Sequence, residues 1–341
     1  MSSSCVFAWY GTPPVRYRYV MQTNEPIRWG LLGTARINTK LLAGARLSSS
    51  TEVVAVGSRS ADAAQAYAEA NGVARAHGSY EALLADPDVD AIYISLPNSL
   101  HHPWTMTALA AGKHVLCEKP YTRHAEDVDV AWDAAAAAGL VLQEGYMWRH
   151  PPQAARLVEL LPSIGDISGI RATFGHNLAA ADDIRVSAAL DGGSLMDVGC
   201  YCVSAARLLA GAEPDVVYGR QVTTAEGVDR SFAGLLHFPT GLTATFHSTF
   251  DSPTESLEVI GRDGTIFLPD PWHSTQGLIL VDGEEQRVEI INPYQCELDD
   301  MAAAIRGEKL PRLGRDDALG QARTIEALYR SANEGQPVSL A

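Results

Sequence analysis

The sequence predicts an α/β fold with a parallel sheet in the first half of the chain and a large open, mixed and mainly antiparallel sheet in the second. Two observations carry this prediction. Up to residue 145, short apolar runs alternate with stretches of helical length, a pattern typical of parallel α/β sheets. From residue 216 to residue 291, alternating strand patterns follow one another and are separated by Gly or Pro turns.

In the first half, short buried strands are expected at 27–32, 53–57, 90–96, 114–117 and 140–145. Helices are expected between them, from 34 to about 47 and over 61–70, 80–84, 100–111 and 125–138. Gly112 and Gly139 follow two of these helices, where glycine is a common end signal because it adopts the left-handed conformation easily.

In the second half, a strand is expected at 167–177 and a helix that starts near Ser194, after Gly192-Gly193. Further strands are expected at 231–238, 242–248, 256–260 and 279–291. Two amphipathic helices, 294–306 and 316–332, are expected to pack back on the first domain. We expect one domain over residues 25–148 and a second over 149–341, because Pro151-Pro152 suits a domain junction.

The 341 residues carry a formal net charge of −15, which argues against nucleic acid or an anionic membrane as a general partner. No apolar run has the roughly 20 residues that a membrane-spanning helix needs. The five cysteines have neither zinc-ligand spacing nor the pattern of a disulfide framework, which indicates reduced thiols, a cytoplasmic location and no metal site. We expect residues 1–24, with a second methionine at Met21, to be a loose leader.

The turn Gly33-Thr34-Ala35-Arg36-Ile37-Asn38 lies between the first strand and the first helix, where a dinucleotide-binding fingerprint would stand. Only the first glycine of Gly-x-Gly-x-x-Gly is present, so an ordinary strand-to-helix turn is an open alternative. The helix N-terminus would still present free N–H groups to a pyrophosphate.

The end of the second strand indicates which dinucleotide would bind. NAD-binding proteins commonly place an acidic residue there to bind the ribose 2′-hydroxyl, whereas this chain has Ser58-Arg59-Ser60. A guanidinium between two hydroxyls suits a 2′-phosphate. We therefore expect NADP(H) as the preferred cofactor. The nearby Asp62 leaves NAD(H) open, and a solvated loop arginine is the structural alternative.

The strand at 114–117 runs into Glu118-Lys119-Pro120, and a proline cannot continue a β-ladder. The carboxyl ends of parallel strands face the ligand crevice, so Glu118 and Lys119 would lie at its mouth. A lysine fixed there by a rigid strand suits proton transfer or the polarisation of an oxygen.

Three motifs together resemble the glucose–fructose oxidoreductase/inositol dehydrogenase/rhizopine catabolism protein (Gfo/Idh/MocA) family. Pro-Asn-x-x-His occupies 97–101, Ala-Gly-Lys-His-Val occupies 111–115 and Glu-Lys-Pro occupies 118–120, in the expected order and spacing. The resemblance extends over about residues 27–335. It implies an N-terminal Rossmann domain, a C-terminal α/β domain whose open sheet covers the active site, and hydride exchange between a nicotinamide cofactor and a carbinol or ketone of a sugar-like ring.

The resemblance also implies site residues. The segment 144–153 resembles the family's exit from the Rossmann domain, which would bring Arg149 near the nicotinamide and Trp148 into the pocket wall. A structural ion pair is the alternative for Arg149. The expected cofactor-binding residues are Gly33, Thr34, Ala35, Arg36, Ile37, Ser58, Arg59, Leu96, Pro97, Asn98, His101, Glu118, Lys119 and Arg149.

The expected catalytic residues are Lys119, beside the reacting oxygen, Asp197 and Tyr201. Asp197 and Tyr201 are four residues apart and would share one helix face. Where many family members have Asp-x-Gly-x-His, this chain has tyrosine, which resembles the subgroup containing glucose–fructose oxidoreductase, dimeric dihydrodiol dehydrogenase, pyranose dehydrogenases and some deoxysugar ketoreductases. In that subgroup the tyrosine hydroxyl handles the carbinol proton.

We expect Lys119 and an oxidised nicotinamide to lower the pKa of Tyr201, because positive charge favours the phenolate. Asp197 would orient Lys119 or the substrate hydroxyl. Together with Trp148, these three residues form the expected substrate site. The structural alternative for Tyr201 is a buried helix tyrosine whose hydroxyl is hydrogen-bonded.

The leading hypothesis is an NADP(H)-dependent oxidoreductase whose small-molecule substrate is a sugar or a similar cyclic polyol or diol. The alternatives are a nucleotide-diphosphate-ketosugar reductase of deoxysugar biosynthesis, a non-catalytic sugar- or cofactor-sensing protein of the same fold, and a redox-neutral glycosidase with a retained NAD. Because a large open sheet needs cover, a homodimer or tetramer is expected.

Overall fold

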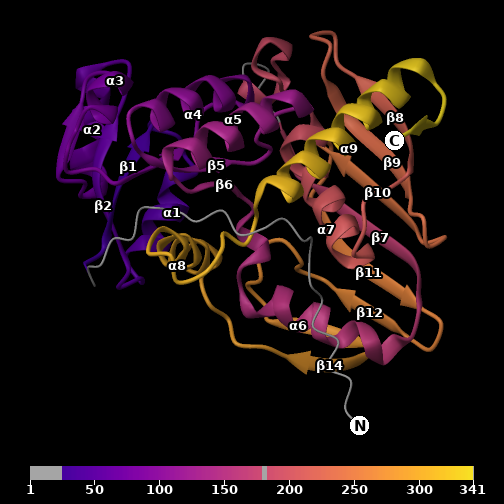
Figure 1. Cartoon of the computed structure of the whole chain (residues 1–341). Coiled ribbons are helices and arrows are strands. Elements are labelled where there is room, and N and C mark those ends of the chain that lie inside the picture. Colours follow the sequence, from indigo (N-terminus) through magenta and orange to yellow (C-terminus); the bar gives the residue numbers. More distant parts are fainter. Residues whose placement is uncertain (1–24, 179–182, 341) are drawn as a thin grey trace.

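A computed structural model of the chain describes residues 25–178 and 183–340, so the expected leader over residues 1–24 lies outside the described residues. The first half forms a six-stranded parallel sheet in the order β3-β2-β1-β4-β5-β6 (Figure 1). Its strands are β1 (Ile27–Leu32), β2 (Thr51–Gly57), β3 (Arg75–His77), β4 (Ala91–Ile94), β5 (His114–Glu118) and β6 (Leu142–Gly145). The helices between them are α1 (Asn38–Ala45), α2 (Ala61–Asn71), α3 (Tyr80–Leu84), α4 (His101–Ala110) and α5 (Ala125–Ala138).

The central strands of this sheet are buried throughout, which explains their uninterrupted apolar sequences: every residue of β4 and β5 is buried. The edge strand β3 was not predicted from the sequence. Its three residues, Arg-Ala-His, have no apolar alternation, and they become a strand by pairing in parallel with β2. Tertiary pairing, rather than local propensity, produces this strand.

The second half forms a nine-stranded sheet in the order β14-β13-β12-β11-β7-β10-β9-β8-β15. Only β7 and β10 pair in parallel, and all other neighbours are antiparallel. This confirms the predicted mixed, mainly antiparallel sheet. Its strands are β7 (Ile167–Gly175), β8 (Val216–Thr223), β9 (Asp229–His237), β10 (Thr243–Thr249), β11 (Thr254–Gly261), β12 (Thr265–Leu268), β13 (Leu278–Val281), β14 (Glu284–Arg287) and β15 (Val338–Ser339).

The single strand expected over 279–291 is instead the hairpin of β13 and β14. Its two-residue turn is Asp282-Gly283, and both residues have positive φ, 50° and 85°. Turns of this kind match the right-handed twist of the flanking strands. The turn signal was therefore present in the sequence as an Asp-Gly pair.

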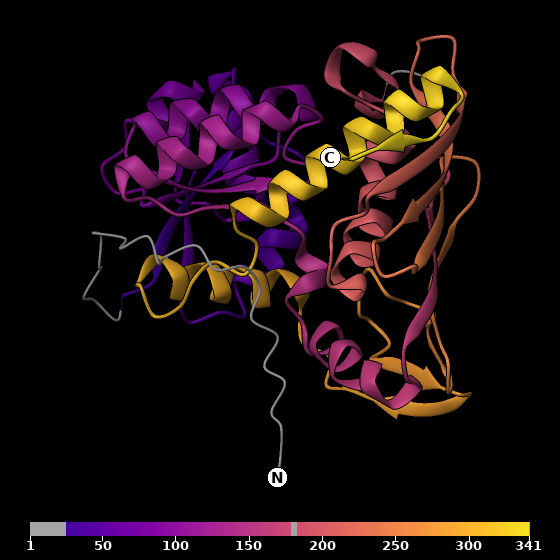
Figure 2. The same ribbon diagram turned by 45° about the vertical axis from the view of Figure 1, so that its right-hand side comes forward.

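Helices α6 (Pro152–Leu160) and α7 (Cys200–Ala210) cover the face of the second sheet that is turned toward the first (Figure 2). Helix α8 (Pro293–Ile305) lies beside α1, and the long helix α9 (Arg315–Glu334) runs between the two sheets. Charged contacts hold both in place. Arg306, after α8, donates to the carbonyl of Glu25 at 2.8 Å, and Arg315 pairs with Asp129 of α5 at 2.6 Å.

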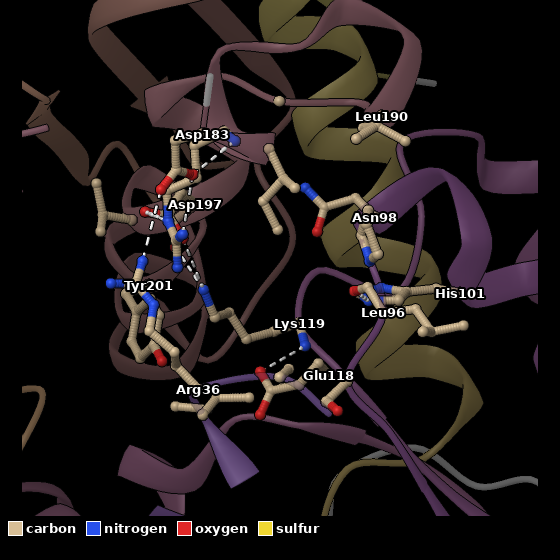
Figure 3. A pocket seen from close by; sticks show the side chains of 18 of the residues that line it. Arg36, Leu96, Asn98, His101, Glu118, Lys119, Asp183, Leu190, Asp197 and Tyr201 are labelled. Carbon is tan, nitrogen blue, oxygen red and sulfur yellow. Dashed lines mark hydrogen bonds and ion pairs between the residues drawn. The ribbon is translucent and has the colours of Figure 1, made fainter. Parts of the chain in front are cut away.

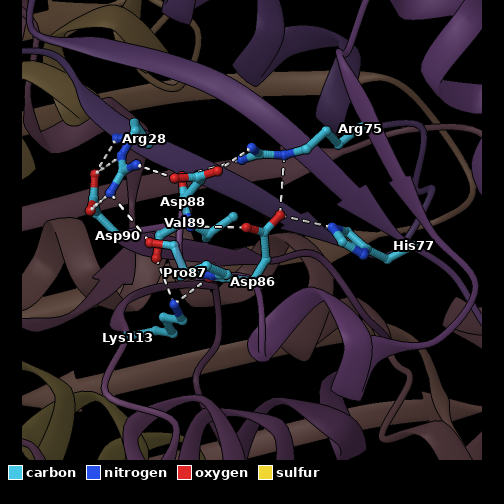
Figure 4. Close-up of polar contacts among 9 residues, drawn as sticks. All are labelled: Arg28, Arg75, His77, Asp86, Pro87, Asp88, Val89, Asp90 and Lys113. Atoms are coloured by element: carbon cyan, nitrogen blue, oxygen red, sulfur yellow. Dashed lines mark hydrogen bonds and ion pairs between the residues drawn. The ribbon is translucent and has the colours of Figure 1, made fainter.

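A polar network fixes the loop 86–90 that leads into β4 (Figure 4). The Arg28 guanidinium binds Asp90 at 2.7 Å, Arg75 binds Asp86 and Asp88, and the Lys113 ammonium donates to the carbonyls of Asp86 and Val89 at 2.7 Å each. Lys113 belongs to the family-like Ala-Gly-Lys-His-Val run, and the structure gives it this structural role.

None of the helices within 25–178 and 183–340 is long and apolar enough to span a bilayer.

Candidate active site

A cavity of about 610 Å³ lies between the carboxyl ends of β4 and β5 and the start of α7 (Figure 3). Side chains of the first domain line one side, and side chains from the second sheet and the loop before α7 line the other. Most of the predicted site residues are in its wall: Ala35, Arg36, Ile37, Leu96, Pro97, Asn98, His101, Glu118, Lys119, Asp197 and Tyr201. The predicted residues that do not line it are Gly33, Thr34, Ser58, Arg59, Trp148 and Arg149.

The three residues expected to be catalytic converge in this cavity although 78 residues separate Lys119 from Asp197. The Lys119 ammonium donates to the Asp197 carbonyl at 2.5 Å and lies 3.6 Å from the Asp197 carboxylate. It also lies 4.9 Å from the centre of the Tyr201 ring. One cation therefore faces both an anion and the phenol.

Asp197 is placed by a wide helical turn. Residues Leu195–Gly199 form a π-helical turn that leads into α7. A Cβ at Gly199 would lie 2.8 Å from the Ser248 hydroxyl of β10, so only glycine lets the turn approach the sheet this closely. The buried Asp229 carboxylate anchors the turn by accepting hydrogen bonds from the Ser194 hydroxyl and the Leu195 N–H.

Two basic side chains that the sequence did not reveal also bind Asp197. Nε2 of His176, just after β7, lies 2.9 Å from Asp197 Oδ2, and Arg185 Nε donates to the same oxygen at 2.9 Å. Burial alone would raise the pKa of Asp197, but Lys119, His176 and Arg185 outweigh it and hold this pKa well below its ordinary value. Asp197 is therefore a permanent anion, and the basic side chains of Lys119, His176 and Arg185 surround it.

Lys119 stays charged. Burial alone would lower its pKa, but interactions with Cys200, Asp197 and Glu118 outweigh burial and raise it. The Cys200 thiol has its own pKa raised to about 12, so near neutral pH the anion that stabilises the ammonium is chiefly Asp197. Lys119 can therefore donate a hydrogen bond to a substrate oxygen as an ammonium.

Tyr201 is held by aromatic rings and presents its phenol to the cavity. Its ring makes edge-to-face contacts with Tyr146, Phe174 and Trp272 at centroid distances of 5.7, 5.2 and 5.8 Å. Among the described residues, none makes a hydrogen bond with the hydroxyl, so the alternative of a satisfied buried tyrosine does not apply. Burial raises the pKa of Tyr201 well above its ordinary value, and Tyr294 and the nearby acids add to this. In the chain itself, burial therefore outweighs the lowering of this pKa that was expected from Lys119.

Glu118 faces the cavity but also binds Tyr93 of β4, whose hydroxyl donates to one of its carboxylate oxygens. Burial raises the pKa of Glu118, against the opposing effects of Lys119 and the Tyr93 hydrogen bond. Glu118 is therefore a weaker acid than an exposed glutamate.

The turn between β1 and α1 has the backbone that a phosphate-binding loop needs. Gly33 has φ 110°, and a Cβ there would lie 3.0 Å from Leu96. Asn38, in the position of the third fingerprint glycine, donates from its side chain to the Gly33 carbonyl at 2.9 Å. The Arg36 side chain is 90% exposed and lies 3.5 Å from Asp183, on the opposite rim of the cavity.

Ser58, Arg59 and Ser60 follow β2 at the same end of the sheet. Ser58 is buried, Arg59 is exposed, and the Ser60 hydroxyl caps α2 by accepting from the Ala63 N–H at 3.3 Å. Arg59 makes no ion pair with any residue in the described part of the chain.

The polar side chains of the Pro-Asn-x-x-His element mainly connect neighbouring segments of the chain by hydrogen bonds. The ring nitrogens of His101 lie 2.9 Å from the Pro120 carbonyl and 2.8 Å from the Leu96 carbonyl, which ties the ends of β4 and β5 together. Asn98 donates to the Asp191 carbonyl at 2.8 Å, across to the loop that precedes α7.

Two residues expected at the site from the domain exit, Trp148 and Arg149, do not line the cavity. Trp148 is 1% exposed and packs edge-to-face on Trp272, so it lies behind the cavity wall, which Met147 and Phe174 form instead. Arg149 binds the Ser204 hydroxyl at 3.2 Å and Asp317 at 3.5 Å, away from the cavity. These contacts are of the kind expected for the alternative interpretation, a structural ion pair, and the approach of Arg149 to a nicotinamide stays a prediction.

Comparison with known proteins agrees with this geometry. Residues 27–146 match a family described as "Oxidoreductase family, NAD-binding Rossmann fold", and residues 160–267 match the "GFO/IDH/MocA C-terminal domain". A D-xylose 1-dehydrogenase (NADP(+)) from Haloferax volcanii is 40% identical over 92% of this chain and 99% of its own.

Two solved structures are similar over nearly their whole length. An aldose-aldose oxidoreductase from Caulobacter crescentus, complexed with glycerol, has a TM-score of 0.85 and 30% identity, over 93% of this chain and 100% of that one. A 3-ketoreductase from Actinomadura kijaniata, complexed with NADP and TDP-benzene, has the same TM-score and identity, over 90% and 98%. The chain thus belongs to the GFO/IDH/MocA family of oxidoreductases.

Proposed function

We propose that this protein uses NADP(H) to oxidise a carbinol carbon, or reduce a ketone carbon, of an uncharged sugar or similar cyclic polyol. The observation that carries the proposal is the convergence of Lys119, Asp197 and Tyr201 on one cavity at the carboxyl ends of the Rossmann strands. Their presence together argues against the alternative of a non-catalytic sensor.

The chain's own residues fit NADP(H). The Gly33 turn has a backbone conformation that favours glycine and leaves no room for a Cβ beside Leu96. Arg59, between two serines and next to Tyr80, makes no ion pair with the described residues and would supply a cation for a 2′-phosphate. The related xylose dehydrogenase and ketoreductase, named with NADP(+) and NADP respectively, support the same cofactor. A bound nicotinamide would supply or accept the hydride.

The protein residues would handle the proton and hold the oxygen. A phenol whose pKa is raised stays protonated near neutral pH, so Tyr201 suits donation of a proton to a ketone oxygen. The Lys119 ammonium would hydrogen-bond the same oxygen and stabilise negative charge that develops on it. Asp197 keeps that ammonium charged and fixes its position.

The charges of the cavity favour an uncharged substrate over a nucleotide diphosphate sugar. Arg36 pairs with Asp183, Arg185 with Asp183 and Asp197, and Lys119 with Asp197. Each of these cationic side chains thus has a carboxylate partner, although the three share Asp183 and Asp197, and this pairing leaves less positive charge for a diphosphate. The xylose dehydrogenase relative supports this choice.

Absorbance at 340 nm with NADP(H) or NAD(H) against aldoses, ketoses, cyclic diols and nucleotide sugars tests the proposal. We expect turnover with NADP(H) and an uncharged sugar, and loss of turnover in Lys119→Ala. Tight cofactor binding without turnover on any compound would indicate the sensor. A preference for nucleotide sugars would indicate the ketosugar reductase instead.

The proposal includes a cytoplasmic homodimer or tetramer, with a domain boundary at residues 148 and 149. Support for self-association comes from the face of the second sheet that is turned away from its helices. Tyr218, Leu235, Thr245, Arg171, Glu258 and Phe267 are successive cross-strand neighbours, so they share that face. Leu235 and Phe267 are each 37% exposed, and a second copy would cover them.

A further inference from the structure

His176 is a cavity residue without a role in the proposed proton transfer. It follows β7, its side chain is 36% exposed, and it lies in the cavity wall across from the Rossmann strands. Its Nε2 lies 2.9 Å from Asp197 Oδ2. A histidine at position 201 would belong to the family-like Asp-x-Gly-x-His pattern, but here a histidine reaches the aspartate from a different element.

The two carboxylate oxygens of Asp197 have different partners. His176 Nε2 and Arg185 Nε both bind Oδ2, whereas Oδ1 lies 3.6 Å from the Lys119 ammonium. Two donors on Oδ2 fix the rotation of the carboxylate and so aim Oδ1 at Lys119. His176 thus acts on Lys119 through Asp197.

The groups that face His176 come from several elements. Asp197 precedes α7, Arg185 lies in the loop before it, and Lys119 lies at the end of β5 on the far side of Asp197. The Phe250 ring, after β10, lies 5.2 Å from the imidazole. The hydrogen bond to Asp197 raises the pKa of His176, against the effects of burial and of Arg185.

We infer that His176 is a positioning residue that aims the Asp197 carboxylate at Lys119 and, as an imidazolium, adds positive charge to the site where the substrate oxygen is held. The inference rests on the proposed function. Because ketone reduction builds negative charge on that oxygen, the added charge favours the reaction. The loss of this charge as the imidazole deprotonates should slow reduction, at a pH above the ordinary histidine range because the Asp197 hydrogen bond raises the pKa of His176.

The test compares His176→Gln, which keeps an N–H donor but does not titrate, with His176→Ala, which removes the donor. The matched control is His237→Gln. His237 also binds an aspartate, Asp215, at 2.7 Å, but it lies on β9 outside the cavity. Initial rates of ketosugar reduction with NADPH are measured from pH 5.5 to 9 for each protein.

We expect the falling limb of the kcat profile to be present in the wild type and in His237→Gln, and absent in His176→Gln. In His176→Ala, kcat should fall about tenfold, the size expected for losing one hydrogen bond to a charged group, with a smaller change in KM. An unchanged limb in His176→Gln overturns the inference and assigns the titration to another group, such as Glu118.

A second measurement separates this inference from the proposed function. The imidazole of His176 is titrated by NMR in the holoprotein and in Asp197→Asn, where the midpoint should move to lower pH because the carboxylate charge is lost. An unchanged midpoint would show that the Asp197 carboxylate does not bind His176, and it would overturn the inference. If the wild type reduces no sugar at any pH, the proposed function fails, and the NMR midpoints still decide whether Asp197 holds His176.

Discussion

At the scale of single residues, the surroundings of Lys119 and Tyr201 keep both side chains protonated. Lys119 remains an ammonium because Asp197 lies against it, and Tyr201 remains a phenol because burial opposes its ionisation. The chain is therefore arranged to give a proton to an oxygen when a ketone is reduced. In the oxidative direction, additional positive charge has to favour the phenolate.

Replacing Tyr201 with Phe removes the proposed acid while keeping the ring contacts with Tyr146, Phe174 and Trp272. We expect kcat to fall by about 10²–10⁴-fold with little change in KM, the range typical of general acid catalysis. Tyr218→Phe, on the open face of the second sheet, is the control and should keep wild-type kcat. If Tyr201→Phe retains normal turnover, Tyr201 is not the acid.

Arg59 is expected to set cofactor preference. Removing it in Arg59→Ala should raise KM for NADP(H) by about 10–100-fold, because a hydrogen-bonded charge pair contributes roughly 1.5–3 kcal/mol, while KM for NAD(H) changes little. Arg220→Ala, an exposed arginine on β8, provides the control. Equal effects on both cofactors would show that Arg59 does not bind a 2′-phosphate.

The residues that sequence could identify are those fixed to the ends of predictable elements. Lys119 follows a buried strand that ends at a proline, and Asp197 and Tyr201 lie one helical turn apart. His176 and Arg185 could not be found in this way. His176 reaches Asp197 only because β7 is placed in the middle of the second sheet, and Arg185 lies in a polar loop without periodicity. Trp148 was expected in the cavity wall, but its burial against Trp272 depends on the same tertiary packing.

At the scale of elements, the charged residues that stabilise the first sheet lie in a different loop from the charged residues that line the cavity. The loop before β4 binds Arg28, Arg75 and Lys113 in one closed network, whereas the loops after β4 and β5 line the cavity (Figure 4). The alternation of strands and helices was predictable because each central strand is buried on both sides. The short edge strand β3 and the π-helical turn before α7 were not, because both depend on tertiary contacts.

Lys113 should contribute to stability rather than to activity. Lys113→Met would leave the buried carbonyls of Asp86 and Val89 without their donor, so we expect the free energy of unfolding to fall by about 1–3 kcal/mol. Urea unfolding followed by circular dichroism measures this change, and kcat at 25 °C should stay the same. A stability equal to that of the wild type would contradict the role assigned to Lys113.

His114, which connects β5 with the residue before β6, should make the stability of the protein depend on pH. Its Nδ1 accepts the Val141 N–H at 2.9 Å, and burial lowers its pKa from 6.5 to about 4, so the unfolded chain binds the proton more readily. Its effect on stability is constant above about pH 6.5 and becomes unfavourable as pH falls toward 4, by about 2 kcal/mol at pH 5. His114→Gln should therefore lose less stability than the wild type between pH 7.5 and pH 5. An equal loss in both proteins would contradict this.

At the scale of the whole molecule, the cavity exists only where the two halves of the chain meet. Helix α9 and the contacts of Asn98 with Asp191 and of Arg36 with Asp183 hold the halves together. The open face of the second sheet lies away from this junction and is free for self-association. Leu235→Glu should reduce the mass measured by light scattering toward 36.5 kDa, while Glu159→Ala, on α6 at the other face of this sheet, keeps the wild-type mass. A monomeric wild type would contradict an assembly through this face.

The most direct test of the proposed reaction follows the hydride itself. A sugar that the wild type oxidises is prepared with deuterium on the reacting carbon and incubated with NADP⁺, and the reduced cofactor is analysed by NMR. We predict that the deuterium appears at C4 of the nicotinamide and that Lys119→Ala and Tyr201→Phe transfer it at least 100-fold more slowly. Reduced cofactor without the label, or no reduction with any sugar of the panel, would contradict the account.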